Sequence, residues 1–184
     1  MKSEIHLIGA GGLASDFIAC FKTVFDIKGC WDDNLVKGEM YMNVPVMGSV
    51  DDLMNASKSF PVIITIANPQ VRNRIYSRIQ SSIHQSPSIV HPESKMYDLG
   101  SIVIGNGSVV FPGVHITTKV VIGNHVIVHI GSSIHHDVQI GDCSVLMPGV
   151  RLTGNVVIGN NVFIGPGETI SHGSRILDDE QVKK

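Results

Sequence analysis

The C-terminal half of the chain carries a repeat in which every sixth residue is aliphatic. From Ile104 to Ile176, all thirteen positions at this spacing hold Val, Ile or Leu, without a break in register. The fourth residue after each of these anchors, up to the anchor at Ile170, is Ser or Val, except at Glu168. A spacing of six fits neither the 3.5-residue period of a coiled coil nor the 3.6-residue period of a helix.

This repeat predicts a parallel β-helix with three faces. Each hexapeptide forms a short strand and a corner, and three hexapeptides make one coil. Successive coils then stack at the spacing of neighbouring strands, about 4.8 Å. The anchors point inward and fill the core. Gly-Asn pairs near the corners are expected to tolerate positive φ, namely Gly105-Asn106, Gly123-Asn124 and Gly159-Asn160.

The N-terminal part of the chain shows a different pattern, in which short apolar strands alternate with helices. We expect strands at 5–8, 27–31 and 62–66, an edge strand at 44–46, and helices at 13–24, 51–57 and 69–81. Ser49 is a candidate cap for the second helix. This order predicts a small Rossmann-like βαβ domain, and a Ser/Pro-rich linker at 81–92 leads into the coils. We therefore expect two domains, residues 1–82 and 83–184.

A glycine-rich turn lies between the expected first strand and first helix. The segment from Gly9 to Ala14 fits G-x-G-x-x-G/A, whose backbone N–H groups can hold a diphosphate at a helix N-terminus. Asp32 and Asp33 end the second strand, where an acid that contacts ribose or base would lie. A purely structural turn beside a solvated loop, or an NAD site, are the alternatives. The domain is half the size of a full dinucleotide fold, which favours a mononucleotide.

Composition and charge narrow the class of protein. Hydrophobic residues make up 43% of the chain and the net charge is −2, without a basic run, so nucleic acid is not an expected partner. The three cysteines form no CxxC motif, which favours a reducing compartment. No apolar stretch reaches membrane-spanning length and no signal peptide is evident. We expect a soluble, cytoplasmic protein without a membrane partner.

Among nine histidines, His136 stands out because of its place in the repeat. At a spacing of three hexapeptides, its column reads Thr118, His136, Gly154 and His172. Gly154 would therefore lie one coil above His136 and leave room for a small planar group, while Asp137 could orient the imidazole. A corner histidine that bonds a neighbouring coil is the structural alternative.

Two other chemistries find less support in the sequence. A trimeric zinc lyase of the γ-carbonic anhydrase type needs three histidine ligands, and His129 and His135 occupy different faces of the coil. We expect no metal. Cys143 is a weak candidate nucleophile, because His125 is the only histidine next to it in its column.

Several segments, in this order, resemble the NeuD/PglD-type sugar O- and N-acetyltransferases over nearly all of residues 4–176. They are Ile8-Gly9-Ala10-Gly11-Gly12, Trp31-Asp32-Asp33-Asn34, Val44-Pro45-Val46-Met47-Gly48, Ile89-Val90-His91-Pro92, Ile134-His135-His136-Asp137 and Gly154-Asn155. The resemblance implies a left-handed β-helix and a homotrimer that holds acetyl-CoA between neighbouring coils. The chain departs from the family at Leu13-Ala14, where a His-Gly pair is common, and at Val145, where many members have a second histidine. The sequence ends at Lys184, where relatives usually add a coil and a Gly-Asn-Pro-Ala-like tail that helps to hold CoA.

The resemblance also implies roles for individual residues. His136 is the expected general base, Asp137 assists it, and the Gly154 N–H binds the acetyl carbonyl. We assign Gly154 and His172 to acetyl-CoA. The residues assigned to the sugar or UDP-sugar substrate are Gly9, Gly11, Gly12, Asp32, Asp33 and Asn68.

The expected function is acetyl-CoA-dependent acetylation of an amino group, or a hydroxyl, on a nucleotide-linked or acidic sugar in bacterial surface-glycan biosynthesis. An acetyltransferase that acts on serine or a simple sugar is one alternative, although such relatives lack a nucleotide-type domain. A non-catalytic nucleotide-sugar-binding hexapeptide protein is the other.

Overall fold

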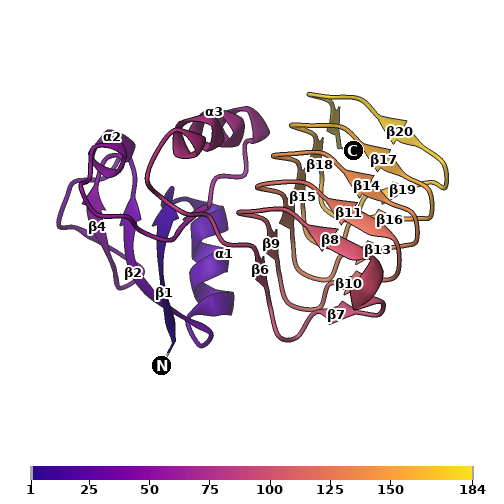
Figure 1. Cartoon of the computed structure of the whole chain (residues 1–184), viewed down its shortest axis with the longest axis horizontal. Coiled ribbons are helices and arrows are strands. Elements are labelled where there is room, and N and C mark those ends of the chain that lie inside the picture. The colour runs from indigo at the N-terminus through magenta and orange to yellow at the C-terminus, as the bar shows by residue number, and fades with distance from the viewer. Residues whose placement is uncertain (1, 184) are drawn as a thin grey trace. The chain divides into compact units, whose positions relative to one another are not determined.

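The computed structural model describes residues 2–183 and divides the chain into two compact units (Figure 1). The N-terminal unit contains the residues up to Ala67 together with Arg74–Pro87. The coil unit contains Asn68–Asn73 and the residues from Ser88 onward. The boundary between the units therefore passes through one helix.

The N-terminal unit is built on a five-stranded sheet with the strand order β3-β4-β2-β1-β5. β1 pairs in parallel with β2 and β5, β2 pairs in parallel with β4, and only β3 runs antiparallel. This arrangement confirms the Rossmann-like prediction. The elements are β1 (Ser3–Ile8), α1 (Gly12–Phe21), β2 (Phe25–Trp31), β3 (Met40–Tyr41), β4 (Val44–Gly48), α2 (Val50–Met54), β5 (Val62–Ile64) and α3 (Pro69–Gln80).

Four element predictions for this unit need correction. β5 ends at Ile64, two residues before the expected end at 66. The helix α1 ends at Phe21, its last buried position, because the chain then turns with the Val24 N–H donating to the Phe21 carbonyl at 2.9 Å. β4 is not an edge strand, since the two-residue strand β3 covers it. α2 ends at Met54, although Ser49 does cap it through a reciprocal capping box with Asp52.

The coil unit is a parallel β-helix with three sheets, and Figure 1 shows its strands stacked coil upon coil. Anchors at the six-residue spacing, from Val110 to Ile170, form one buried core, as predicted. The strands are β6 (Ile89–Val90), β7 (Lys95–Met96), β8 (Ile102–Ile104), β9 (Val109–Val110), β10 (His115–Ile116), β11 (Val120–Ile122), β12 (Ile127–Val128), β13 (Ser133–Ile134), β14 (Gln139–Ile140), β15 (Val145–Leu146), β16 (Arg151–Leu152), β17 (Val157–Ile158), β18 (Phe163–Ile164), β19 (Thr169–Ile170), β20 (Arg175–Ile176) and β21 (Gln181–Val182).

The β-helix is longer than the repeat indicated. β6 and β7 lie in the segment predicted to be a linker or to precede the repeat. Ile89 pairs with Val109, whereas Ile102 pairs with Val120, so the first coil is longer than the regular coil by two positions. The extra positions fall around the short 3-10 helix Leu99–Ser101, and they break the six-residue register. The six-residue periodicity of the sequence therefore does not reveal the first coil.

The fold requires glycine at the corners for a different reason from the predicted tolerance of positive φ. Neither member of the Gly-Asn pairs has positive φ. A Cβ at Gly105 would lie 2.5 Å from the Gly123 carbonyl oxygen, so glycine is needed because successive coils approach closely there. Asn and Asp side chains occur together at this corner and form a ladder, in which the Asn106 N–H donates to Asn124 Oδ1 at 3.0 Å and the Asn124 N–H donates to Asp142 Oδ1 at 2.7 Å. Positive φ occurs instead at other corner positions, including His125, Asp137 and Asn155.

Candidate active site

His136 and Asp137 form a hydrogen-bonded pair at a corner of the coil unit, just after β13. His136 Nδ1 lies 2.8 Å from Asp137 Oδ2. Asp137 has a φ of +59°, which turns its side chain back toward the preceding residue, and its N–H donates to the Thr118 carbonyl at 3.2 Å. Because Nδ1 is committed to the carboxylate, Nε2 is the ring nitrogen that can exchange a proton with a ligand. The His136 side chain is 49% exposed, so a ligand can reach it.

Gly154 lies directly against the His136 ring, one coil further along. A Cβ added at Gly154 would collide with Cε1 and Nε2 of His136. The Asn155 N–H donates to the His136 carbonyl at 3.0 Å, which ties the two coils together. Among the hydrogen bonds of residues 2–183, none uses the N–H of Gly154. A backbone donor is therefore available beside the exposed nitrogen of the imidazole.

His172 follows in the same column, on the other side of Gly154. Its ring centroid lies 6.2 Å from that of His136, with the planes tilted by 49°. Its Nε2 is 3.4 Å from Asn155 Nδ2, and the next residue, Gly173, donates its N–H to the Gly154 carbonyl at 3.1 Å. The structure thus brings together all four residues predicted at this corner.

The three glycines of the N-terminal turn differ in whether the fold requires glycine at their position. Gly9 has a φ of +101°, and a Cβ there would lie 2.5 Å from the Ile66 side chain, so the fold requires glycine at this position. A Cβ at Gly11 or Gly12 would meet nothing within 4 Å. The backbone at Gly11 and Gly12 is therefore open to a ligand at the start of α1.

The two predicted acidic residues bind backbone amides. Asp32 accepts the Ala10 N–H through Oδ2 and the Asn34 N–H through Oδ1, both at 2.8 Å, so it holds the glycine turn against the end of β2. Asp33 Oδ1 accepts the N–H of Val50, the first residue of α2, at 2.8 Å. Only Asp32 therefore has a hydrogen bond to the glycine turn.

Tyr41 is a neighbour of the glycine turn that sequence reasoning missed. Its hydroxyl donates to the Gly11 carbonyl at 2.9 Å and lies 2.5 Å from Ser15 Oγ. Tyr41 belongs to β3, a strand too short to show any alternation, so nothing in the sequence indicated that it returns to this turn. The two hydroxyls add polar atoms beside the first turn of α1.

Asn68 makes its hydrogen bonds to α3, unlike the other predicted substrate residues. Its Oδ1 accepts the Val71 N–H at 3.0 Å, and its carbonyl accepts the Arg72 N–H at 2.9 Å, so it caps the start of α3. Asn68 belongs to the coil unit, whereas the glycine turn and both aspartates belong to the N-terminal unit.

A fully buried arginine was also missed, and it bears on the candidate nucleophile. Arg72 donates from Nη1 to the His125 carbonyl at 3.0 Å, and burial lowers the pKa of its guanidinium to about 10. Burial, aided by the Arg72 charge, lowers the pKa of His125 to about 3. Burial raises the pKa of the Cys143 thiol to about 12. Cys143 is thus a buried thiol, a poor nucleophile beside a neutral histidine.

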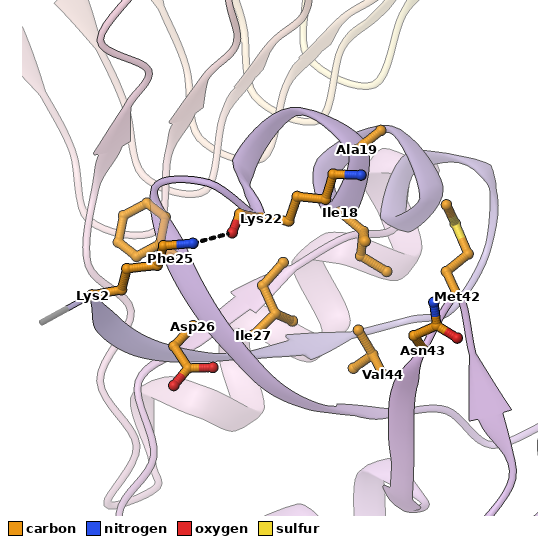
Figure 2. Close-up of a pocket in the computed structure, with 10 residues that line it drawn as sticks. All are labelled: Lys2, Ile18, Ala19, Lys22, Phe25, Asp26, Ile27, Met42, Asn43 and Val44. Atoms are coloured by element: carbon orange, nitrogen blue, oxygen red, sulfur yellow. Dashed lines mark hydrogen bonds between the residues drawn. The ribbon is translucent and has the colours of Figure 1, made fainter.

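Figure 2 shows a pocket of the N-terminal unit with the residues that line it. It has a volume of about 420 Å³ and is formed at the starts of β1 and β2, whereas the glycine turn follows the end of β1. Its wall includes Ile18, Ile27 and Val44, and the Lys2 ammonium donates to the Lys22 carbonyl at 2.7 Å. None of the predicted site residues lines this pocket.

Within residues 2–183, no three His, Cys, Asp or Glu side chains are grouped so that they could hold a metal ion. The helices in this range are too short or too polar to cross a membrane.

Comparison with known proteins identifies both units. Residues 4–79 match the PglD N-terminal domain, and residues 119–154 match the bacterial transferase hexapeptide (six repeats). No match was found among curated protein sequences.

Solved structures cover nearly the whole chain. The acetyltransferase domain of PglB from Neisseria gonorrhoeae is 25% identical, with a TM-score of 0.87 over 98% of this chain and 88% of that one. The same domain in complex with acetyl coenzyme A is matched with 21% identity and a TM-score of 0.75, over 98% and 96% of the two chains. A variant of perosamine N-acetyltransferase from Caulobacter crescentus, in complex with CoA and GDP-perosamine, has 19% identity and a TM-score of 0.75, over 97% and 92%.

Residues 4–79 thus form a PglD-type N-terminal domain, and residues 119–154 carry the hexapeptide repeats of bacterial transferases. The enzyme class of the protein is acetyltransferase, and the predicted resemblance to the NeuD/PglD-type sugar acetyltransferases is confirmed. The predicted left-handed β-helix is confirmed as well.

Proposed function

We propose that this protein transfers the acetyl group of acetyl-CoA to an amino group of a nucleotide-linked sugar, with a sugar hydroxyl as the second candidate acceptor. The observation that carries the proposal is the corner at which the side-chain-free Gly154 lies against the ring of a His136–Asp137 pair. Solved relatives hold acetyl coenzyme A in one case and CoA with GDP-perosamine in another, which supports both substrates.

His136 acts as the general base in this proposal. Its Nε2 removes a proton from the acceptor, and Asp137, bound to Nδ1, stabilises the resulting imidazolium. The amine attacks the thioester carbon, and negative charge develops on the carbonyl oxygen. The N–H of Gly154, which has no acceptor within residues 2–183, donates to that oxygen.

The N-terminal unit binds the sugar nucleotide. Gly11 and Gly12 offer an open backbone at the N-terminus of α1, where the macrodipole favours a diphosphate. Asp32 fixes the turn through the Ala10 N–H, and Asp33 stands at the end of the same strand. Gly9 contributes by shaping the turn.

A homotrimer remains part of the proposal. The sheet that contains β8 and β11 exposes Val103 and Val121 on its outer face, and Leu99 is also exposed just before β8. Apolar side chains in a row on a rigid sheet favour burial against a second subunit, and a closed three-fold ring would cover each copy equally. Light scattering of the purified protein measures its molar mass in solution, for which we expect the value of a trimer. We expect the trimer to dissociate in the Val121→Lys variant. The proposed location is the cytoplasm, where acetyl-CoA is available.

The decisive experiment measures thiol release from acetyl-CoA with a panel of acceptors. The panel contains UDP-4-amino sugars, GDP-perosamine-type sugars and sialic acid, with serine and simple sugars for comparison. We expect turnover with a nucleotide-linked amino sugar and a loss of about 10²–10⁴-fold in His136→Ala. His135→Ala is the matched control, because His135 is an exposed neighbour outside the column.

The outcomes separate the rival functions. Turnover with serine or a simple sugar alone would favour the simpler acetyltransferase, and binding of a sugar nucleotide without turnover would favour a non-catalytic binder. Full activity in His136→Ala would reject the assignment of the base.

A further inference from the structure

His172 places a second imidazole beside His136 and Gly154. His136 and His172 lie two coils apart, which amounts to about 9.6 Å of stacking distance. Their ring centroids are nevertheless only 6.2 Å apart. The rings approach each other because Gly154, between them, has no side chain. Both rings therefore border the space beside the Gly154 N–H.

The two histidines differ in their polar partners. His136 Nδ1 is bonded to a carboxylate at 2.8 Å, whereas the polar partner of His172 within residues 2–183 is the neutral Asn155 amide at 3.4 Å. The carboxylate occupies Nδ1 of His136 and leaves Nε2 as the nitrogen that faces a ligand. No carboxylate is bonded to the His172 ring within residues 2–183, so the two rings differ in which nitrogens are already engaged.

We propose that His172 is a further catalytic residue, which protonates the CoA sulfur as it leaves; this deepens the proposed acetyl transfer and rests on it. The amine nitrogen forms a bond to the carbonyl carbon, the carbonyl π electrons move to oxygen, and the nitrogen loses a proton to His136 Nε2. The carbonyl then re-forms while the C–S bond breaks, and its electron pair passes to sulfur. The sulfur takes a proton from the His172 imidazolium.

The protons balance over the cycle. An amide and a free thiol leave, His136 has gained one proton, and His172 has lost one. Both side chains are exposed, so water can remove the first proton and return the second. With two imidazoles, one accepts the proton of the amine and the other donates a proton to the sulfur. A single base would have to accept the proton and then donate it to a different atom.

The test varies the leaving group in the His172→Gln variant. With acetyl-CoA, we expect kcat to fall about 10²-fold while KM for acetyl-CoA changes little. With S-acetyl-4-nitrothiophenol, whose thiolate departs without a proton, we expect the variant and the wild type to react at similar rates. His135→Gln is the matched control and should behave as the wild type with both donors. A melting curve checks the fold of each variant.

Each result has a separate meaning. A fall in kcat that is equally large with both donors would reduce His172 to a structural role and overturn the inference. An effect on KM alone would leave it as a CoA-binding residue and also overturn it. Wild-type kcat in His172→Gln, with inactive His136→Ala, would sink this inference and spare the proposed function. Absence of acetyl transfer by the wild-type protein would overturn both.

Discussion

The Gly154→Ala substitution tests the geometry of the site more sharply than removal of a functional group. Gly154 does not have positive φ, so alanine can adopt its backbone conformation without strain. The new Cβ would fall on Cε1 and Nε2 of His136. The backbone N–H remains in the variant, so any effect reports the displacement of the imidazole and leaves the proposed oxyanion donor in place.

We expect Gly154→Ala to lower kcat strongly and the free energy of unfolding only slightly. His136 is half exposed and can rotate into solvent, which breaks its bond with Asp137. An exposed pair of this kind contributes about 0–1 kcal/mol, so we expect the free energy of unfolding to fall by no more than about 1 kcal/mol. A base moved away from its substrate loses its contribution to catalysis, so kcat should fall about 10²–10⁴-fold.

The assay combines thiol release with urea unfolding, and Gly100→Ala is the control. Gly100 also lacks positive φ, and the nearest atom to its added Cβ is Asp98 Oδ1 at 3.9 Å, so this variant should keep both activity and stability. The double variant Gly154→Ala/His136→Ala should be no slower than His136→Ala, because both changes remove the same base. Wild-type turnover in Gly154→Ala, or losses that multiply in the double variant, would refute the reasoning.

Three further predictions address burial and backbone strain. The pKa of His125 is lowered to about 3 in the folded protein, while the unfolded chain takes up a proton near pH 6.5; its contribution to stability is therefore present above pH 6.5 and lost as the pH falls toward 3. We expect a loss of about 2 kcal/mol between pH 7.5 and 5 in urea unfolding, and a His125→Asn variant should lack this part of the pH dependence. Burial raises the pKa values of Cys30 and Cys143 to about 11 and 12, so a disulfide reagent at pH 8 should modify only Cys20 rapidly, and a second fast thiol would contradict the buried positions. Gly9→Ala should lower the free energy of unfolding by at least about 2 kcal/mol, since alanine at a φ of +101° is strained and its Cβ meets a neighbouring side chain; an unchanged unfolding midpoint would disprove this.

The sequence predicts the β-helix well because each coil repeats the same environment. Every anchor packs in the same narrow core, so the requirement for an aliphatic side chain recurs at thirteen positions between Ile104 and Ile176. Where the requirement is interrupted, prediction fails. The first coil, with β6 and β7, is offset by two positions, and its strands are too short to be recognised alone.

The N-terminal unit is less predictable for the converse reason. Its helices and long strands have their own apolar patterns, and these appear close to the expected places. The contacts that shape the candidate nucleotide site come from residues with no pattern. Tyr41 returns to Gly11 from a two-residue strand, and Asp32 reaches back to Ala10. Such hydrogen bonds depend on how separate segments meet, which no local period encodes.

The difference between the two units explains why the sequence predicts the neighbours of His136 more directly than it predicts the contacts of the candidate substrate residues. In a β-helix, a spacing of three hexapeptides converts directly into a neighbour one coil away, so the sequence alone places His136, Gly154 and His172 in one column. The same rule gives a column its chemical meaning, because the side chain missing at one coil determines the room available to rings on the coils beside it. A stack of this kind holds the His136 ring, the Gly154 backbone and the His172 ring at fixed spacing while both imidazoles stay exposed, which is the arrangement that the proposed proton transfers require.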